Sequence, residues 1–63
     1  MPYVNVRILT GRTHEQKAQL AQVITQALTD ICGAPAAGTH VVIDEVEREN
    51  WAVGGQLVAD RDS

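Results

Sequence analysis

Residues 13–35 read THEQKAQLAQVITQALTDICGAP, and this stretch decides the fold. Thr13 and Gln16 match a capping box, in which the threonine hydroxyl accepts from the Gln16 amide and the Gln16 side chain reaches back. An apolar stripe follows at spacings of three and four residues: Leu20, Val23, Ile24, Ala27, Leu28 and Ile31. Gly33 suits a left-handed C-cap, and Pro35 prevents continuation. The stretch therefore predicts a helix that begins at about His14.

Strand patterns flank this helix on both sides. Residues 3–9 (YVNVRIL) alternate apolar residues with Tyr3, Asn5 and Arg7, which is typical of a strand. Residues 39–46 (THVVIDEV) contain three consecutive β-branched residues, which indicate a second strand buried on both faces. Strand, helix and strand in this order form a βαβ unit, so we expect the two strands to be parallel with a right-handed crossover.

The end of the chain predicts a hairpin. Residues 51–59 (WAVGGQLVA) place two adjacent glycines, Gly54 and Gly55, between short apolar segments, and such a pair suits a tight hairpin turn. We therefore predict an α/β (α+β) fold, a β-α-β unit with a C-terminal β-hairpin, in which residues 1–63 form a single domain.

The length of the chain favours self-association. A domain of 63 residues buries only about 60% of its unfolded surface when it folds alone. Cys32 is the only cysteine, so an internal disulfide is excluded, and we interpret this residue as a small buried one. Two strands covered by one helix also leave a sheet face and two edges bare. With no disulfide available, oligomerisation is the remaining way for so small a domain to be stabilised.

Charge and composition exclude several function classes. The net charge is −3 and the five basic residues are scattered along the sequence. They form no basic patch of the kind that binds nucleic acid or an acidic membrane. No signal peptide or membrane-length apolar stretch is visible, so we expect a cytoplasmic protein. One cysteine and two histidines allow no closed zinc site. The acidic cluster Asp44, Glu45, Glu47 and Glu49 mixes strand faces and loop, which favours a solvated edge over a metal site.

Pro2 is the first candidate for chemistry. Met1 is removed by methionine aminopeptidase when the next residue is small, and this leaves a secondary amine at the start of a strand. An α-amino group ordinarily titrates at about 7.7–8.0, and burial or nearby cations lower the more basic amine of proline. A neutral amine is a competent general base near pH 7. Met-Pro is also a common start, and proline is tolerated at the first residue of a strand.

Three further residues are candidates for substrate binding. Arg12, just before the helix, offers a bidentate grip on a carboxylate, or it is a solvated loop arginine. Trp51 lines a small-molecule pocket and excludes water from it, or it packs in the core or at an interface. His40 is a proton carrier, a carboxylate partner or a structural histidine.

Taken in order, these segments resemble the 4-oxalocrotonate tautomerase family, the short-chain branch of the tautomerase superfamily. The resemblance rests on Met-Pro at the start, LTGR at 9–12, THEQK at 13–17, VVIDEV at 41–46 and WAVGG at 51–55. It implies a hexamer built from dimers and a site in which Pro2 is the general base. It also implies that Arg12 binds a substrate carboxylate and that Trp51 lines the pocket, where the family typically has phenylalanine.

His40 departs from the family pattern. The resemblance implies a second arginine here, contributed by a neighbouring subunit, and histidine cannot form the two-pronged carboxylate grip. We therefore predict an isomerase that ketonises a 2-hydroxymuconate-like dienoic acid slowly, or a related 2-hydroxy or 2-oxo acid, without a cofactor. Its place would be in aromatic catabolism or biosynthesis. The alternatives are a hydratase or dehalogenase acting on an unsaturated acid, and a non-catalytic oligomeric module.

Overall fold

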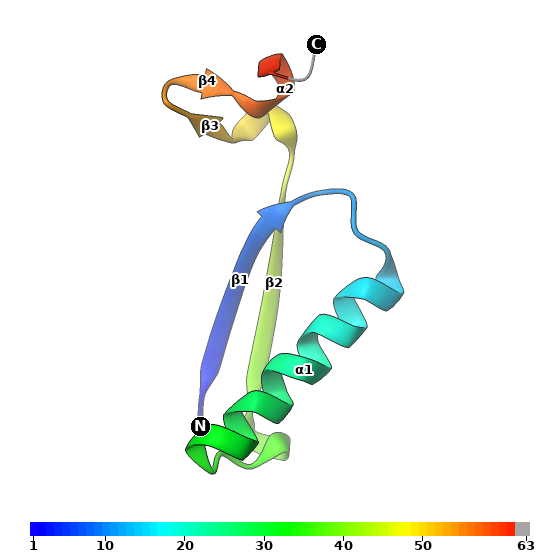
Figure 1. Cartoon of the computed structure of the whole chain (residues 1–63), viewed down its shortest axis with the longest axis vertical. Coiled ribbons are helices and arrows are strands. Elements are labelled where there is room, and N and C mark those ends of the chain that lie inside the picture. Colours follow the sequence, from blue (N-terminus) through cyan, green and yellow to red (C-terminus); the bar gives the residue numbers. More distant parts are fainter. Residues whose placement is uncertain (62–63) are drawn as a thin grey trace.

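A parallel pair of strands and one long helix form the body of the molecule. The computed structural model describes residues 1–61. Its first part comprises β1 (Tyr3–Leu9), α1 (His14–Cys32), the 3₁₀ turn η1 (Ala36–Gly38) and β2 (His40–Val46). β1 and β2 are parallel, with α1 crossing beside them (Figure 1). The predicted β-α-β unit is confirmed.

The register of the sheet gives it two different faces. Tyr3 lies opposite His40 at one end, and Leu9 lies opposite Val46 at the other. Side chains alternate across a strand, so Glu45 points to the side of α1, where its carboxylate accepts from the Lys17 ammonium at 2.7 Å. The opposite face has no helix over it among the described residues. We call this helix-free side the open face; it carries Tyr3, Asn5, Arg7, Leu9, His40, Val42, Asp44 and Val46.

Both predicted ends of α1 are confirmed. The Gln16 amide donates to the Thr13 hydroxyl at 3.1 Å, and the Thr13 amide donates to the Gln16 side chain at 2.9 Å. At the other end Gly33 is left-handed, with φ 71°, and its amide donates to the Thr29 carbonyl at 3.0 Å. These caps satisfy backbone groups that the helix itself leaves unpaired.

The apolar stripe of α1 divides into two. Leu20, Ile24 and Leu28 are half-buried on the side of the sheet. Val23 and Ile31 are 58% and 81% exposed, because they lie on the flank of the helix that the single sheet does not reach. One chain therefore covers only part of the apolar surface of its helix.

The C-terminal segment stands apart from the body (Figure 1). It comprises the 3₁₀ turn η2 (Arg48–Asn50), β3 (Ala52–Val53), β4 (Gln56–Leu57) and α2 (Val58–Arg61). The hairpin turns at Gly54 and Gly55, with φ 61° and 84°, where a side chain would be strained. The extension of the hairpin to residue 59 was wrong, since the chain enters α2 at Val58, whose amide donates to the Trp51 carbonyl at 2.7 Å.

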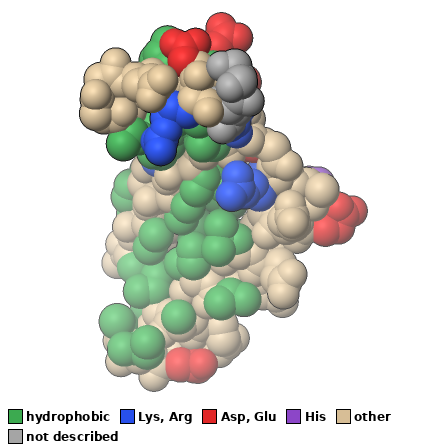
Figure 2. All heavy atoms as spheres, turned by 45° about the horizontal axis from the view of Figure 1, so that its top comes forward, with side chains coloured by type: hydrophobic (Ala, Val, Ile, Leu, Met, Phe, Trp, Pro, Cys, Tyr) green, Lys and Arg blue, Asp and Glu red, His purple; other side chains and the backbone are tan. Residues whose placement is uncertain are grey.

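The single chain is too extended to have a core of its own. Its radius of gyration is 14.8 Å, whereas about 11 Å is typical of a compact chain of this length. None of residues 1–61 is fully buried. Figure 2 shows hydrophobic side chains gathered in an open band below the C-terminal segment. Two predicted burials were wrong in the single chain, since Val42 is 41% exposed on the open face and Cys32 is exposed at the end of α1.

Candidate active site

Pro2 and His40 lie side by side at one end of the sheet. The His40 amide donates to the Pro2 carbonyl at 3.0 Å, and the next residue along, Tyr3, is the register partner of His40. Pro2 is half-buried and the His40 side chain is exposed. Met1 is 92% exposed, so its removal would bare the Pro2 nitrogen without disturbing packed side chains.

Arg12 and Trp51 lie toward the other end. Arg12 follows β1 and Trp51 follows η2, just beyond β2. Both strands have seven residues, so about 20 Å of sheet separates their two ends. The four predicted site residues therefore fall into two pairs only by the end of the sheet at which they lie, and one chain does not bring the two pairs together.

Arg12 faces the helix and not Trp51. Its Nη1 donates to the Leu9 carbonyl at 3.5 Å. The guanidinium borders a depression along α1 whose other lining residues are Gln16, Gln19, Leu20 and Val23. Arg12 is exposed there, so it is accessible to a carboxylate.

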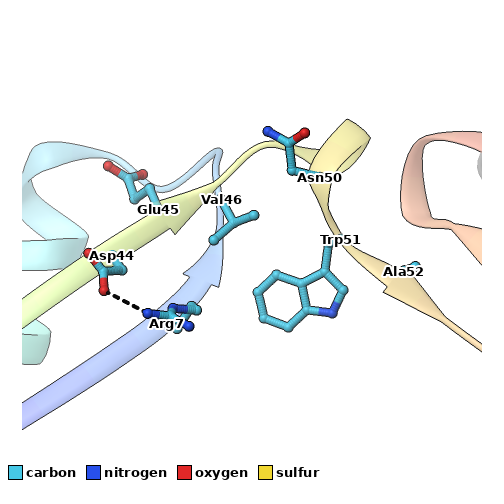
Figure 3. Close-up of a pocket in the computed structure, with 7 residues that line it drawn as sticks. All are labelled: Arg7, Asp44, Glu45, Val46, Asn50, Trp51 and Ala52. Atoms are coloured by element: carbon cyan, nitrogen blue, oxygen red, sulfur yellow. Dashed lines mark hydrogen bonds and ion pairs between the residues drawn. The ribbon is translucent and has the colours of Figure 1, made fainter.

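Trp51 borders a separate hollow of about 550 Å³ between β2 and the hairpin. Its lining residues are Arg7, Asp44, Glu45, Val46, Asn50, Trp51 and Ala52. Figure 3 shows the Arg7 side chain, Val46 and the indole bordering one space, while the Glu45 and Asn50 side chains extend away from it. The volume lies within the range of about 300–1,000 Å³ that small-molecule sites occupy.

Arg7 was not predicted as a site residue, and Asp44 was considered only as part of the acidic cluster. They are register partners on the open face, and the Arg7 Nη2 lies 3.4 Å from the Asp44 carboxylate. The Asn5 amide donates to the same carboxylate oxygen at 3.0 Å. Hydrogen bonds from Asn5 and Arg7 hold the pKa of Asp44 below its usual range. The alternation of residues 3–9 puts Asn5 and Arg7 on one face, but their pairing with Asp44 required the register.

The acidic residues of β2 lie at the surface of the single chain, each beside a cation. Asp44 and Glu45 point to opposite faces and pair with Arg7 and Lys17 respectively. Within residues 1–61, no group of three or more His, Cys, Asp or Glu side chains is arranged to hold a metal ion. Nor is any helix in this part of the chain long and apolar enough to cross a membrane.

Comparisons with known proteins identify the family of the chain. The family described as Tautomerase enzyme matches residues 2–61. The probable tautomerase K2 of Dickeya dadantii (strain 3937) is 52% identical over 62 residues, 97% of this chain and 92% of that protein. The 2-hydroxymuconate tautomerase of Bacillus subtilis (strain 168) is 40% identical over 60 residues, 95% of this chain and 97% of that protein.

A solved structure shares the whole fold. TomN, a 4-oxalocrotonate tautomerase homologue in the tomaymycin biosynthetic pathway, superposes with a TM-score of 0.94 at 34% identity, covering 97% of this chain and 94% of its own. The predicted fold class is confirmed. This chain therefore belongs to the tautomerase family, and it is an isomerase of the 4-oxalocrotonate tautomerase type.

Proposed function

We propose that the protein ketonises a 2-hydroxy-dienoic acid of the 2-hydroxymuconate type, with the amino group of Pro2 as the general base. The observation that carries the proposal is the position of Pro2. It lies half-buried directly before the first residue of β1, next to the exposed Met1. The 2-hydroxymuconate tautomerase from Bacillus subtilis, 40% identical, supports the substrate class.

The reaction moves one proton. The neutral Pro2 nitrogen takes the proton of the substrate's 2-hydroxyl, and the electron pair of that O–H bond forms the carbonyl. The electrons of the diene shift along the conjugated chain, and the protonated Pro2 returns the proton to a carbon at its far end. Arg12 would hold a carboxylate, and Trp51 would exclude water from the pocket. His40 would donate to the oxygen on which charge develops.

The complete site would lie between copies of the chain. Pro2 and His40 sit about 20 Å from the end of the sheet that carries Arg12 and Trp51, so one molecule of substrate reaches both pairs only if they come from different subunits. The extended shape, with a radius of gyration of 14.8 Å, favours the same conclusion. We propose a homohexamer assembled as a trimer of dimers, acting in the cytoplasm on a small unsaturated acid without a cofactor.

For the pathway we propose two settings, aromatic catabolism and biosynthesis. TomN, which shares the fold, belongs to a biosynthetic pathway, and the Bacillus subtilis relative is named as a 2-hydroxymuconate tautomerase. The same proton transfer suits catabolism or biosynthesis, because it requires only a conjugated enol as substrate.

Removal of Met1 gives the decisive experiment. Intact mass separates processed protein, which has a free secondary amine at Pro2, from protein that retains Met1 and has an amide there. Ketonisation of 2-hydroxymuconate, followed by absorbance, should fall by about 10²–10⁴-fold in the unprocessed form, since that is the usual contribution of a general base. Equal rates for the two forms would overturn the role of Pro2.

A further inference from the structure

We propose that Arg7 is a specificity-determining residue that binds the second carboxylate of a diacid substrate in the hollow beside Trp51. The inference rests on the proposed function and adds to it, because the resemblance implied Arg12 and the residue at position 40 as the carboxylate ligands. The structure places a different cation in the hollow that the indole borders. Arg7 lines the Trp51 hollow, whereas Arg12 lines the depression along α1.

The guanidinium of Arg7 is available for a ligand. In the single chain its side chain is 65% exposed, and its contact with Asp44 is made by Nη2 at a long 3.4 Å. A guanidinium has five N–H donors in a rigid fork that fits a carboxylate in two-pronged fashion. A planar acid lying against the Trp51 indole would bring its terminal carboxylate to this fork (Figure 3).

Asp44 contacts one nitrogen of the Arg7 guanidinium and has a second partner. Asn5 donates to the same carboxylate oxygen at 3.0 Å, which is shorter than the contact from Arg7. Asp44 therefore keeps a hydrogen bond when Arg7 turns toward a ligand. The carboxylate of Asp44 also opposes a second negative charge in the hollow, so it sets how strongly the site prefers diacids.

The placement of Arg7 bears on the histidine at position 40. Both residues lie on the open face, Arg7 near the end of β1 and His40 at the start of β2. An imidazole cannot grip a carboxylate at two points. With Arg7 in the hollow, the chain still has two arginines, Arg7 and Arg12, to bind the two carboxylates of a diacid. His40 can then donate to the substrate oxygen on which negative charge develops.

A matched pair of unreactive ligands tests the proposal without relying on catalysis. trans,trans-Muconate and sorbate share the same diene and one carboxylate, and differ in a second carboxylate against a methyl group. Their Kd values are measured by calorimetry on the processed, assembled protein, for the wild type and for Arg7→Ala, Arg7→Lys and Asp44→Asn. Arg61→Ala is the control, since it removes an exposed cation that lines neither depression.

We expect wild type to prefer muconate over sorbate by about tenfold, the worth of a charge-assisted hydrogen bond. Arg7→Ala should reduce this ratio to about twofold or less, Arg7→Lys should give an intermediate ratio, and Asp44→Asn should raise it about threefold. Arg61→Ala should leave it unchanged. Because the measurement is a ratio between two ligands, a general loss of folding or assembly would weaken both equally.

Two results would overturn the inference. One is an unchanged muconate preference in Arg7→Ala. The other, decisive if Arg7→Ala does not assemble, is an unchanged or lowered preference in Asp44→Asn. Failure of the proposed function would give a different result from failure of this inference. It would appear as equal ketonisation rates with and without Met1, whatever the ratio of the two Kd values.

Discussion

His40 is the residue at which this chain departs from the arginine that its resemblance implied. The side chain is exposed at the first position of β2, beside Pro2. An arginine there would carry a permanent charge and offer two donors to the oxygens at the reacting end of a diacid. We therefore expect His40→Arg to raise kcat/KM for 2-hydroxymuconate by about tenfold, which is less than the roughly 10²–10³-fold that a whole oxyanion donor contributes, because His40 already supplies one donor.

The control for this substitution is His40→Gln, which keeps a neutral donor of similar reach. Stopped-flow absorbance at several pH values measures all three proteins. His40→Gln should stay within a few-fold of wild type, because the amide keeps a hydrogen-bond donor of similar reach and adds no permanent charge. A lower kcat/KM in His40→Arg would mean that His40 serves a substrate of different polarity and is not a weakened arginine site.

At the scale of the element, α1 depends on the left-handed conformation of Gly33. Its φ is 71°, and no atom lies within 4 Å of the position that a Cβ would take. Any effect of a side chain there is therefore backbone strain and not a clash. Gly33→Ala should lower the free energy of unfolding by about 1 kcal/mol.

Gly33→Asn is the matched variant, because asparagine tolerates the left-handed region and is the next most common residue at this cap. Thermal unfolding by circular dichroism should rank wild type above Gly33→Asn and Gly33→Ala last. Equal stability of Gly33→Ala and wild type would show that the C-terminal turn of α1 rearranges when the glycine is lost.

The elements of this chain were predictable where a local signal fixes the backbone. Thr13, Gln16 and Gly33 specify both ends of α1, and the Gly54-Gly55 pair specifies the hairpin turn. α2 was missed, because one turn of helix has too few hydrogen bonds to be set by propensity and depends on its contacts with η2 and β4.

The candidate site was predictable only in part, for a related reason. Spacing identified Pro2, Arg12 and Trp51 as chemistry-bearing residues, but which side chains share a hollow depends on the path of the chain after β2. That path separates Arg12 from Trp51 and brings Arg7 to the indole. Alternation along residues 3–9 placed Arg7 on a face of the sheet without indicating what would lie beside it.

At the scale of the whole molecule, the accessible surface of the chain is larger than that of a compact monomer of the same mass. It amounts to 4667 Å², whereas about 4,000 Å² is typical of a folded monomer of 6.8 kDa. Val42 is 41% exposed at the middle of the open face, and Val53 is 53% exposed on the hairpin. Apolar surface in these places favours coverage by further copies of the chain.

Val42→Glu tests whether the open face is an interface. A carboxylate at this position would be unpaired once a second copy covers it, at a cost of roughly 3 kcal/mol or more per site. We expect a smaller native mass by sedimentation at micromolar concentration, together with loss of ketonisation, because one chain does not bring Pro2 and Trp51 together. Gln22→Glu, which adds the same charge at an exposed position of α1, should keep both the wild-type mass and the wild-type rate. If Val42→Glu sediments and turns over like wild type, the open face faces solvent and the two halves of the site must meet through another surface.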